Sequence, residues 1–212
     1  MDSRARILEI ADELRAVANL GLHYAKRDGR AYDQERYERA LRLSAELLAL
    51  ADSRDADEIL RLYSGNLDHV TPKATADAAL FDADGRIFLA QRFDDHLWCI
   101  PGGALNVGET AAEGAAREML EECGLVVRPR ELIGVFDNRR IGAQPPSPVH
   151  AYHFLFICEH VSGSPTLSGE TLDFGYFAED ALPPLTPGHA IKVELAFRHH
   201  AGLLRETYFD FG

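Results

Sequence analysis

The 212-residue chain carries 34 acidic and 22 basic side chains, a formal net charge of −12, and 46% of its residues are apolar. A chain of this length and composition can bury a core of its own without disulfide or metal staples. Its acidity disfavours a nucleic-acid partner, because nonspecific binding to a phosphate backbone depends on Lys and Arg.

Cysteine usage and the N-terminus bear on the compartment. Cys99, Cys123 and Cys158 stand far apart, form no C-x-x-C pair and are odd in number. This favours free thiols in a reducing cytoplasm. The first twenty residues mix charges with apolar residues, so we expect neither a signal peptide nor a membrane-spanning helix.

The N-terminal part of the chain has helical periodicity. Residues 5–22 place apolar side chains at spacings of one, three and four, which predicts an amphipathic helix. A second, antiparallel helix is expected to begin after Asp33 as its N-cap. The run 55–65 predicts a short third helix that ends at Gly65.

A linker with Pro72 at its end then separates an N-terminal helical domain, residues 1–70, from a main domain, residues 71–212. Because the helices form only a small core, we expect them to pack against the main domain or against a second copy. A homodimer is our hypothesis.

The main domain mixes strands and helices, the α/β (α+β) class. From Lys73 the run ATADAALF, a DADG turn at 82–85 and the run RIFLAQR predict a hairpin of two strands. Further strand-like runs cover residues 132–138, 149–159 and 174–180. The segment 141–149 holds three prolines and predicts an irregular connection.

The stretch 101–125, PGGALNVGETAAEGAAREMLEECGL, carries the chemistry. Thr110 and Glu113 form a capping-box pattern and Gly124 suits a helix end, so the helix should span residues 111–123.

Three glutamates share one face of this helix. Glu118 lies three residues before Glu121 and four before Glu122, so the carboxylates repel one another. A single such pair is most often a solvated face. Three of them favour a hard divalent cation, Mg²⁺ or alternatively Mn²⁺. Arg117 can pair with Glu109 and hold the preceding loop on the helix.

A family resemblance rests on this stretch. The fixed positions of the Nudix box are matched by Gly103, Glu109, Arg117, Glu118, Met119, Glu121, Glu122, Gly124 and Leu125. The segment therefore resembles the Nudix hydrolases. The resemblance implies an α/β/α sandwich with a mixed sheet over about residues 73–182, preceded here by the small helical domain.

The resemblance also implies site roles. Glu118 and Glu122 are expected to be metal ligands, and Glu121 a further ligand or a water-orienting group. The carbonyl of Gly102 or Gly103 is expected to add an oxygen donor. Metal-assisted in-line attack of water would then split a diphosphate.

Arg117 and Glu109 would support this catalytic machinery. The general base stays open between Glu121 and Glu170, because proton-transfer geometry is invisible in a sequence.

A second resemblance concerns the substrate. The N-terminal helices, the TPK linker, WCIPGG and the loop DNRRIGAQPPSPVHAY resemble the Nudix subgroup that acts on X-linked nucleoside diphosphates. This implies a small nucleotide substrate of the CDP-choline or ADP-ribose type. Arg139 and Arg140 could clamp a phosphate or ribose, and Tyr152 could stack a base. The alternative for these residues is solvent-facing arginines and an ordinary core aromatic.

Other functions stay open. The chain could be a Nudix-fold nucleotide sensor without turnover, although no box carboxylate is lost. It could also act on an oxidised nucleoside triphosphate or on a capped RNA end. The N-terminal helices could instead recruit a different partner, for which an exposed apolar face would be the sign. His150 and His153 are three residues apart on an expected strand, so they point to opposite faces and do not suit a shared metal site.

Overall fold

The structure, a computed structural model, describes residues 3–52, 54–64, 71–141 and 150–210. The chain divides into two compact units, Met1–Pro72 and Lys73–Gly212. The expected helix end at Gly65 and the proline-rich residues 142–149 lie outside the described ranges.

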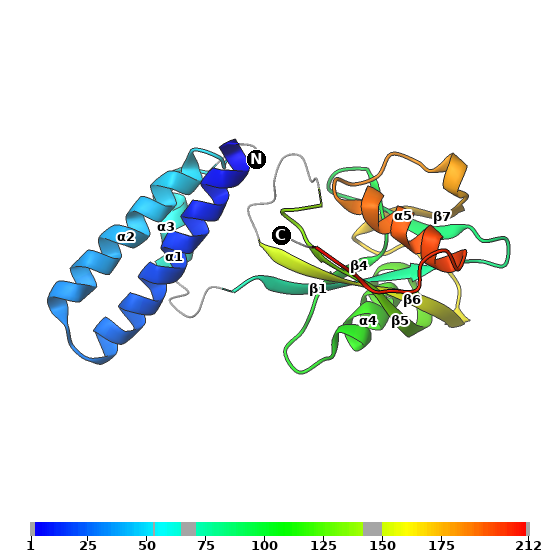
Figure 1. Cartoon of the computed structure of the whole chain (residues 1–212), viewed down its shortest axis with the longest axis horizontal. Coiled ribbons are helices and arrows are strands. Elements are labelled where there is room, and N and C mark those ends of the chain that lie inside the picture. The colour runs from blue at the N-terminus through cyan, green and yellow to red at the C-terminus, as the bar shows by residue number, and fades with distance from the viewer. Residues whose placement is uncertain (1–2, 53, 65–70, 142–149, 211–212) are drawn as a thin grey trace. The chain divides into compact units, whose positions relative to one another are not determined.

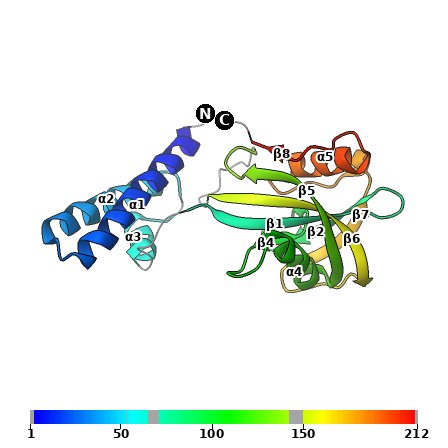
Figure 2. The ribbon, with the colours of Figure 1, turned by 60° about the horizontal axis from the view of Figure 1, so that its bottom comes forward.

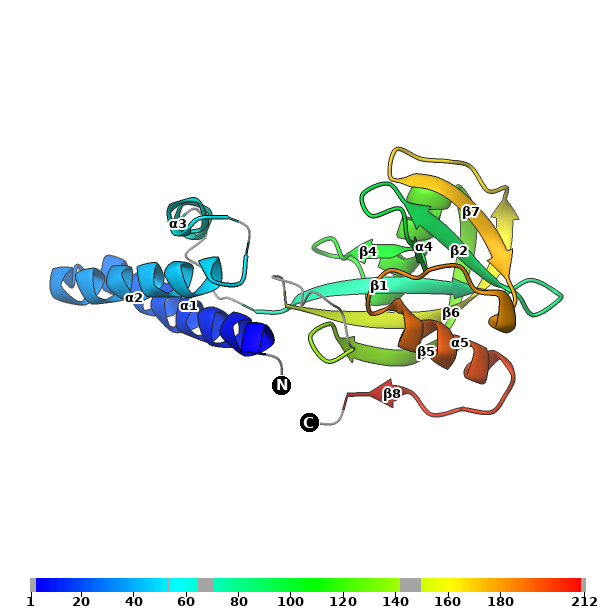
Figure 3. The same ribbon diagram turned by 90° about the horizontal axis from the view of Figure 1, so that it is seen from above.

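The first unit is helical (Figure 1). It contains α1 (Ser3–Arg27), α2 (Ala31–Ala49) and α3 (Ala56–Ser64). Figure 3 shows α1 and α2 side by side as an antiparallel pair. Apolar side chains of all three helices form a small core with Ala51: Leu8, Ala11, Ala18, Leu22, Leu41, Ala45, Leu48, Ile59 and Tyr63. Across the described ranges, no helix combines the length and apolar character needed to cross a bilayer.

The predicted start of the second helix was wrong. The N-cap position is Arg30, whose side chain makes no capping bond, and Asp33 lies within the first turn. An acidic residue in the first turn is favoured by the helix dipole without being the cap, which is why the sequence pattern placed the boundary too late.

The second unit holds two sheets. The strands are β1 (Lys73–Leu80), β2 (Ile87–Arg92), β3 (Trp98–Cys99), β4 (Gly102–Ala104), β5 (Leu125–Asp137), β6 (Ala151–Gly163), β7 (Thr171–Phe177) and β8 (Tyr208–Phe209). A five-stranded sheet has the order β4-β1-β6-β5-β8, and a three-stranded sheet has the order β3-β2-β7. The larger sheet is mixed, since β1 pairs with β6 in parallel and with β4 antiparallel.

The predicted hairpin of the first two strands was wrong. The turn is present, with the Gly85 N–H donating to the Asp82 carbonyl at 3.1 Å. However, β1 and β2 belong to different sheets and are joined only by an isolated bridge between Phe81 and Ile87. Because β1 is buried on both faces, it lies inside the larger sheet between β4 and β6.

Helices cover both faces of the larger sheet (Figure 2). The helix α4 (Ala111–Cys123) lies on one face, α5 (His189–His200) lies on the other, and a short 3₁₀ helix spans Glu179–Ala181. Strand alternation directs Ala78 and Leu80 into the core beneath α4 and Ala79 into the core beneath α5. The mixed α/β fold with preceding helices is thereby confirmed, while α5 and β8 were not predicted.

Candidate active site

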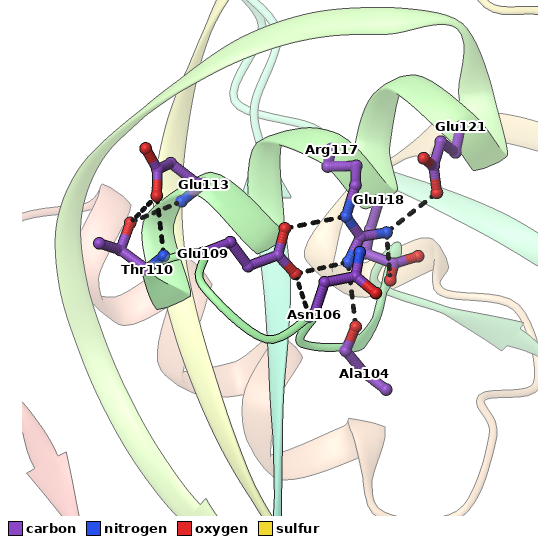
Figure 4. Close-up of polar contacts among 8 residues, drawn as sticks. All are labelled: Ala104, Asn106, Glu109, Thr110, Glu113, Arg117, Glu118 and Glu121. Atoms are coloured by element: carbon purple, nitrogen blue, oxygen red, sulfur yellow. Dashed lines mark hydrogen bonds and ion pairs between the residues drawn. The ribbon is translucent and has the colours of Figure 1, made fainter.

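The helix α4 begins and ends where the sequence predicted. The Thr110 side chain accepts a bond from the Glu113 N–H at 3.2 Å, and a Glu113 carboxylate oxygen accepts from the Thr110 N–H at 2.8 Å (Figure 4). Gly124 ends the helix in the left-handed region at φ 70°. These two local signals fix which glutamates share the exposed face of the helix.

Arg117 ties the preceding loop to this helix (Figure 4). Its guanidinium donates to both carboxylate oxygens of Glu109, at 3.0 and 2.8 Å, and to the Ala104 carbonyl at 3.0 Å. It also donates to Glu118 and Glu121, each at 2.9 Å. The Arg117 hydrogen bonds lower the pKa of Glu109 to about 2. The predicted Arg117–Glu109 pair is therefore present.

A cleft of about 890 Å³ opens beside α4. Helix α4 contributes Glu118, Glu121 and Glu122 to its wall, and strand β4 contributes residues 102–104. Residues 92–94 and 168–170 line it as well, the latter including Glu170. All four candidate glutamates of the metal and base sites thus face one cavity.

Glu122 is the most perturbed of these carboxylates. Burial raises its pKa to about 7, partly opposed by the Gly102 N–H, which donates to Glu122 Oε2 at 3.1 Å. The neighbouring charges of Glu118, Glu170 and Asp77 raise the pKa further. Burial also raises the pKa of Glu118, and its bond to Arg117 lowers it. Negative charge is therefore concentrated here without full compensation.

Two glycines bring backbone close to these carboxylates. A Cβ on Gly103 would lie 2.6 Å from Glu118 Oε1, and one on Gly102 would lie 2.7 Å from the Asp77 Cα. At Gly102 the obstacle is backbone, so only glycine fits there, whereas at Gly103 it is the end of the flexible Glu118 side chain, which would have to move.

The donor set fits a hard divalent cation. Carboxylates and nearby carbonyls are the ligands Mg²⁺ prefers, and it typically keeps waters and substrate phosphates as further ligands. Within the described ranges, no three His, Cys, Asp or Glu side chains converge into a closed metal cage. The pKa of Glu122 is raised because its charge is buried near other carboxylates, and a bound cation would relieve that repulsion.

The three candidate substrate-binding residues do not line the cleft. Arg140 is exposed and its guanidinium lies 3.6 Å from Asp137, whose Oδ1 also accepts the Arg139 N–H at 3.0 Å. Tyr152 is exposed on β6 and lies beside His150, with ring centroids 5.4 Å apart. The structure does not bring these side chains together with the glutamates.

Sequence reasoning missed a buried charged group at the cleft. Asp77 on β1 and Lys192 on α5 form an ion pair of 2.8 Å, and both are almost fully buried. His153 on β6 and His189 on α5 line the cleft beside them. No sequence pattern links residues 115 positions apart, although a lysine within an apolar helix is a sign worth following.

The comparisons with known proteins agree with this geometry. A family model described as a NUDIX domain matches residues 71–196. A second one, described as a UDP-X-like, N-terminal oligomerisation domain, matches residues 5–63. Together the two models cover both units of the chain.

Relatives match over most of the chain. A putative ADP-ribose pyrophosphatase of Bacillus subtilis (strain 168) is 37% identical over 207 residues, 96% of this chain and 96% of that protein. A crystal structure of a UDP-X diphosphatase has a TM-score of 0.61 at 26% identity and covers 98% of this chain and 99% of that one. That of an ADP-ribose pyrophosphatase from Streptococcus suis 89-1591 has a TM-score of 0.58 at 28% identity, over 66% of this chain and 100% of that one. The complete box, the fold and these matches show that the chain belongs to the Nudix hydrolase family.

Proposed function

We propose that the protein is a Mg²⁺-dependent pyrophosphatase that acts on a nucleoside diphosphate joined to a second group X. Its products would be a nucleoside monophosphate and phospho-X. The observation that carries the proposal is the convergence of Glu118, Glu121, Glu122 and Glu170 on one cleft. Mn²⁺ is the alternative cation, because it also prefers carboxylate and carbonyl oxygens.

Glu118 and Glu122 are the proposed principal metal ligands, with the carbonyl of Gly102 or Gly103 as a further oxygen donor. A bound divalent cation would neutralise charge on the diphosphate and lower the pKa of a bound water. Arg117 holds the loop before α4 and the strand β4 against the helix through its bonds to Glu109 and Ala104. Because Arg117 also binds Glu118, it restrains that carboxylate at the edge of the cleft.

Glu170 is the proposed general base rather than Glu121. The carboxylate of Glu121 accepts a hydrogen bond from Arg117 at 2.9 Å, so one of its oxygens already has a partner within the protein. Glu170 lies in a loop directly before β7 and lines the cleft. Its backbone carbonyl accepts the Phe93 N–H at 3.0 Å, which fixes the loop while leaving the carboxylate to the cleft.

The substrate class is supported by the relatives. Proteins named ADP-ribose pyrophosphatase and UDP-X diphosphatase match this chain over both of its units. ADP-ribose, a UDP-linked compound and CDP-choline are therefore the first compounds to try. A substrate role for Arg139, Arg140 and Tyr152 stays a prediction that applies to a part of X extending beyond the cleft.

The assembly proposed is a homodimer formed through the helical domain, residues 1–70, with the hydrolase domain in residues 71–212. The match of residues 5–63 to an oligomerisation domain supports it. One chain has a mass of 23.5 kDa, and light scattering should give twice that value. A mass equal to one chain contradicts the dimer. A cytoplasmic location is supported by Cys99, Cys123 and Cys158, all of which are buried and unpaired.

Product analysis tests the activity. The protein is incubated with Mg²⁺ and, separately, with ADP-ribose, CDP-choline, a UDP-sugar and a nucleoside triphosphate, and the products are separated by anion exchange. We expect one or more of the diphospho-X compounds to yield a nucleoside monophosphate. Glu122→Gln replaces the carboxylate by a neutral amide of the same shape and should abolish the reaction.

The other outcomes select other functions. Release of pyrophosphate from the triphosphate alone would make the protein a nucleoside triphosphate pyrophosphohydrolase. Tight binding of a nucleotide without turnover would make it a sensor. Equal activity of the wild type and Glu122→Gln would contradict the assigned metal site.

A further inference from the structure

The cleft has a polar floor that the proposed hydrolysis does not use. Lys192 is only 1% exposed, and its Nζ lies 2.8 Å from Asp77 Oδ2 and 2.9 Å from His153 Nδ1. Asp77 and His153 come from neighbouring parallel strands, and Lys192 reaches them from α5 on the same face of the sheet. A buried charge of this kind is retained only where its partners satisfy it.

The lysine determines which nitrogen of His153 carries the proton. A protonated lysine has donors and no acceptor, so His153 Nδ1 must be the acceptor of this 2.9 Å bond. Asp77 Oδ2 lies 3.3 Å from the same nitrogen, farther than the ammonium at 2.9 Å, so the shorter contact with Lys192 sets the role of Nδ1. A neutral imidazole whose Nδ1 accepts carries its proton on Nε2, at the opposite edge of the ring.

His189 is fixed in the same form by a different donor. The backbone N–H of Ile100 donates to His189 Nδ1 at 3.2 Å, and a backbone amide nitrogen cannot accept. Burial lowers the pKa of His189 well below its usual value, so this ring is neutral. Both rings line the cleft, and in the part of the chain that the structure describes no protein acceptor is found for either Nε2.

The floor therefore offers hydrogen-bond donors without net charge. The charges of Asp77 and Lys192 cancel, and the bond at Nδ1 of each imidazole leaves Nε2 as its donor. Phosphate groups are best bound by cations, whereas uncharged donors suit uncharged acceptors such as a base carbonyl, a ring nitrogen or a sugar hydroxyl oxygen.

We propose that His153 and His189 bind the uncharged acceptor atoms of the nucleoside part of the substrate through their Nε2–H groups, and that Lys192 is a positioning residue that holds His153 in this tautomer. The inference rests on the proposed function for its substrate class. It adds the part of the cleft that distinguishes a nucleoside from a bare phosphate.

The tautomers can be measured without any substrate. Long-range ¹H–¹⁵N correlation spectra of the ¹⁵N-histidine-labelled full chain distinguish a protonated Nε2 from a protonated Nδ1, and the His153→Gln and His189→Gln variants assign the two rings. We expect both rings to be protonated at Nε2 alone near pH 7.5. A proton on Nδ1 of either ring overturns the assignment for that ring.

Binding is tested with AMP, UMP and inorganic phosphate in the presence of Mg²⁺. Asn at position 153 can still accept from Lys192 but does not reach the cleft, whereas Gln places an amide donor near the position of Nε2. We expect His153→Asn to weaken binding of at least one nucleotide about ten-fold, as for a lost hydrogen bond, and His153→Gln to weaken it less than about three-fold. The variants His189→Asn and His189→Gln should show the same difference in nucleotide binding.

Several results overturn the proposal. Equal losses in the Asn and Gln variants with unchanged melting temperature mean that His153 does not act as a donor. Phosphate affinity that falls as much as nucleotide affinity means that the floor binds phosphate. Wild-type histidine signals that do not shift with AMP or UMP exclude a nucleoside on the floor. Because these measurements need no turnover, they are separate from the product analysis, and either proposal can fail alone.

Discussion

Replacing Glu122 by glutamine should remove activity and at the same time stabilise the cation-free protein. The wild-type carboxyl is held in a buried cluster where its pKa rises from 4.5 to about 7. Glutamine retains an oxygen that can accept the Gly102 N–H, now 3.1 Å from Glu122 Oε2, but carries no charge. The substitution thus removes the repulsion and keeps the hydrogen bond.

The size and sign follow from proton linkage. Between the pKa of the unfolded chain and that of the folded one, the folded protein binds a proton that the unfolded chain has released. The free energy of unfolding therefore falls as the pH rises from about 4.5 to about 7, by up to about 3 kcal/mol for this shift at Glu122. Glu122→Gln should match the wild type near pH 4.5 and exceed it by about 3 kcal/mol above pH 7.

Urea unfolding measures this difference in the catalytic unit. Trp98 is the only tryptophan of the chain and lies in that unit, so its fluorescence follows the unit's unfolding. Titrations are run in chelator at several pH values between about 4.5 and 8. Glu206→Gln removes an exposed carboxylate outside the cleft and serves as the control, with no expected change.

Two results would refute the reasoning. One is that the free energy of unfolding of the wild type, compared with that of Glu122→Gln at each pH, stays constant or rises as the pH increases across this range. The other concerns Mg²⁺. The cation should stabilise the wild type more than the variant, since binding to the folded state alone adds to its stability. Equal stabilisation of both proteins would show that Glu122 does not bind the cation.

Three further substitutions test the surrounding geometry. Gly103→Ala places a Cβ 2.6 Å from the movable Glu118 carboxylate, so hydrolysis should fall about 100-fold while the melting temperature barely changes. Gly102→Ala meets the Asp77 backbone at 2.7 Å, which cannot yield, and the urea midpoint should show a loss of about 1–3 kcal/mol. Lys192→Met removes the ammonium partner of the buried Asp77 carboxylate and should lower the free energy of unfolding by about 3–5 kcal/mol in the same assay. Adding Asp77→Asn to Lys192→Met should recover most of that loss, and a double variant no more stable than the single one would count against the pair.

The parts of the site that the sequence predicted depend on local signals. The bounds of α4 follow from Thr110, Glu113 and Gly124, which lie within or beside the helix they delimit. The Arg117–Glu109 pair spans eight residues and a single turn. Capping, charge spacing and glycine conformation act over such short distances, so a single sequence suffices to place them.

The parts that the sequence missed depend on long-range pairing. Nothing in the run from Lys73 to Arg92 distinguishes a hairpin from two strands that separate into different sheets after one bridge. The choice is made by β6, which pairs with β1 from 78 residues later in the chain, with Lys73 opposite Ala151. The helix α5 was missed because His189 and Lys192 occupy buried positions and interrupt its apolar face.

The two faces of β1 join these observations. Ala76, Ala78 and Leu80 pack beneath α4, so the carboxylate helix is seated on one side of the sheet, while Asp77 points to the side of α5. Charge is compensated within the protein on the side of α5, by Lys192, and is left largely uncompensated where Glu122 faces the cleft. A floor without net charge beside a negatively charged cluster of carboxylates suits a ligand with two unlike parts. One part is a diphosphate that binds together with a cation, and the other is an uncharged nucleoside. The carboxylates of α4 and the groups around Asp77 nevertheless line one cleft, so both halves of the proposed recognition can be served by a single ligand.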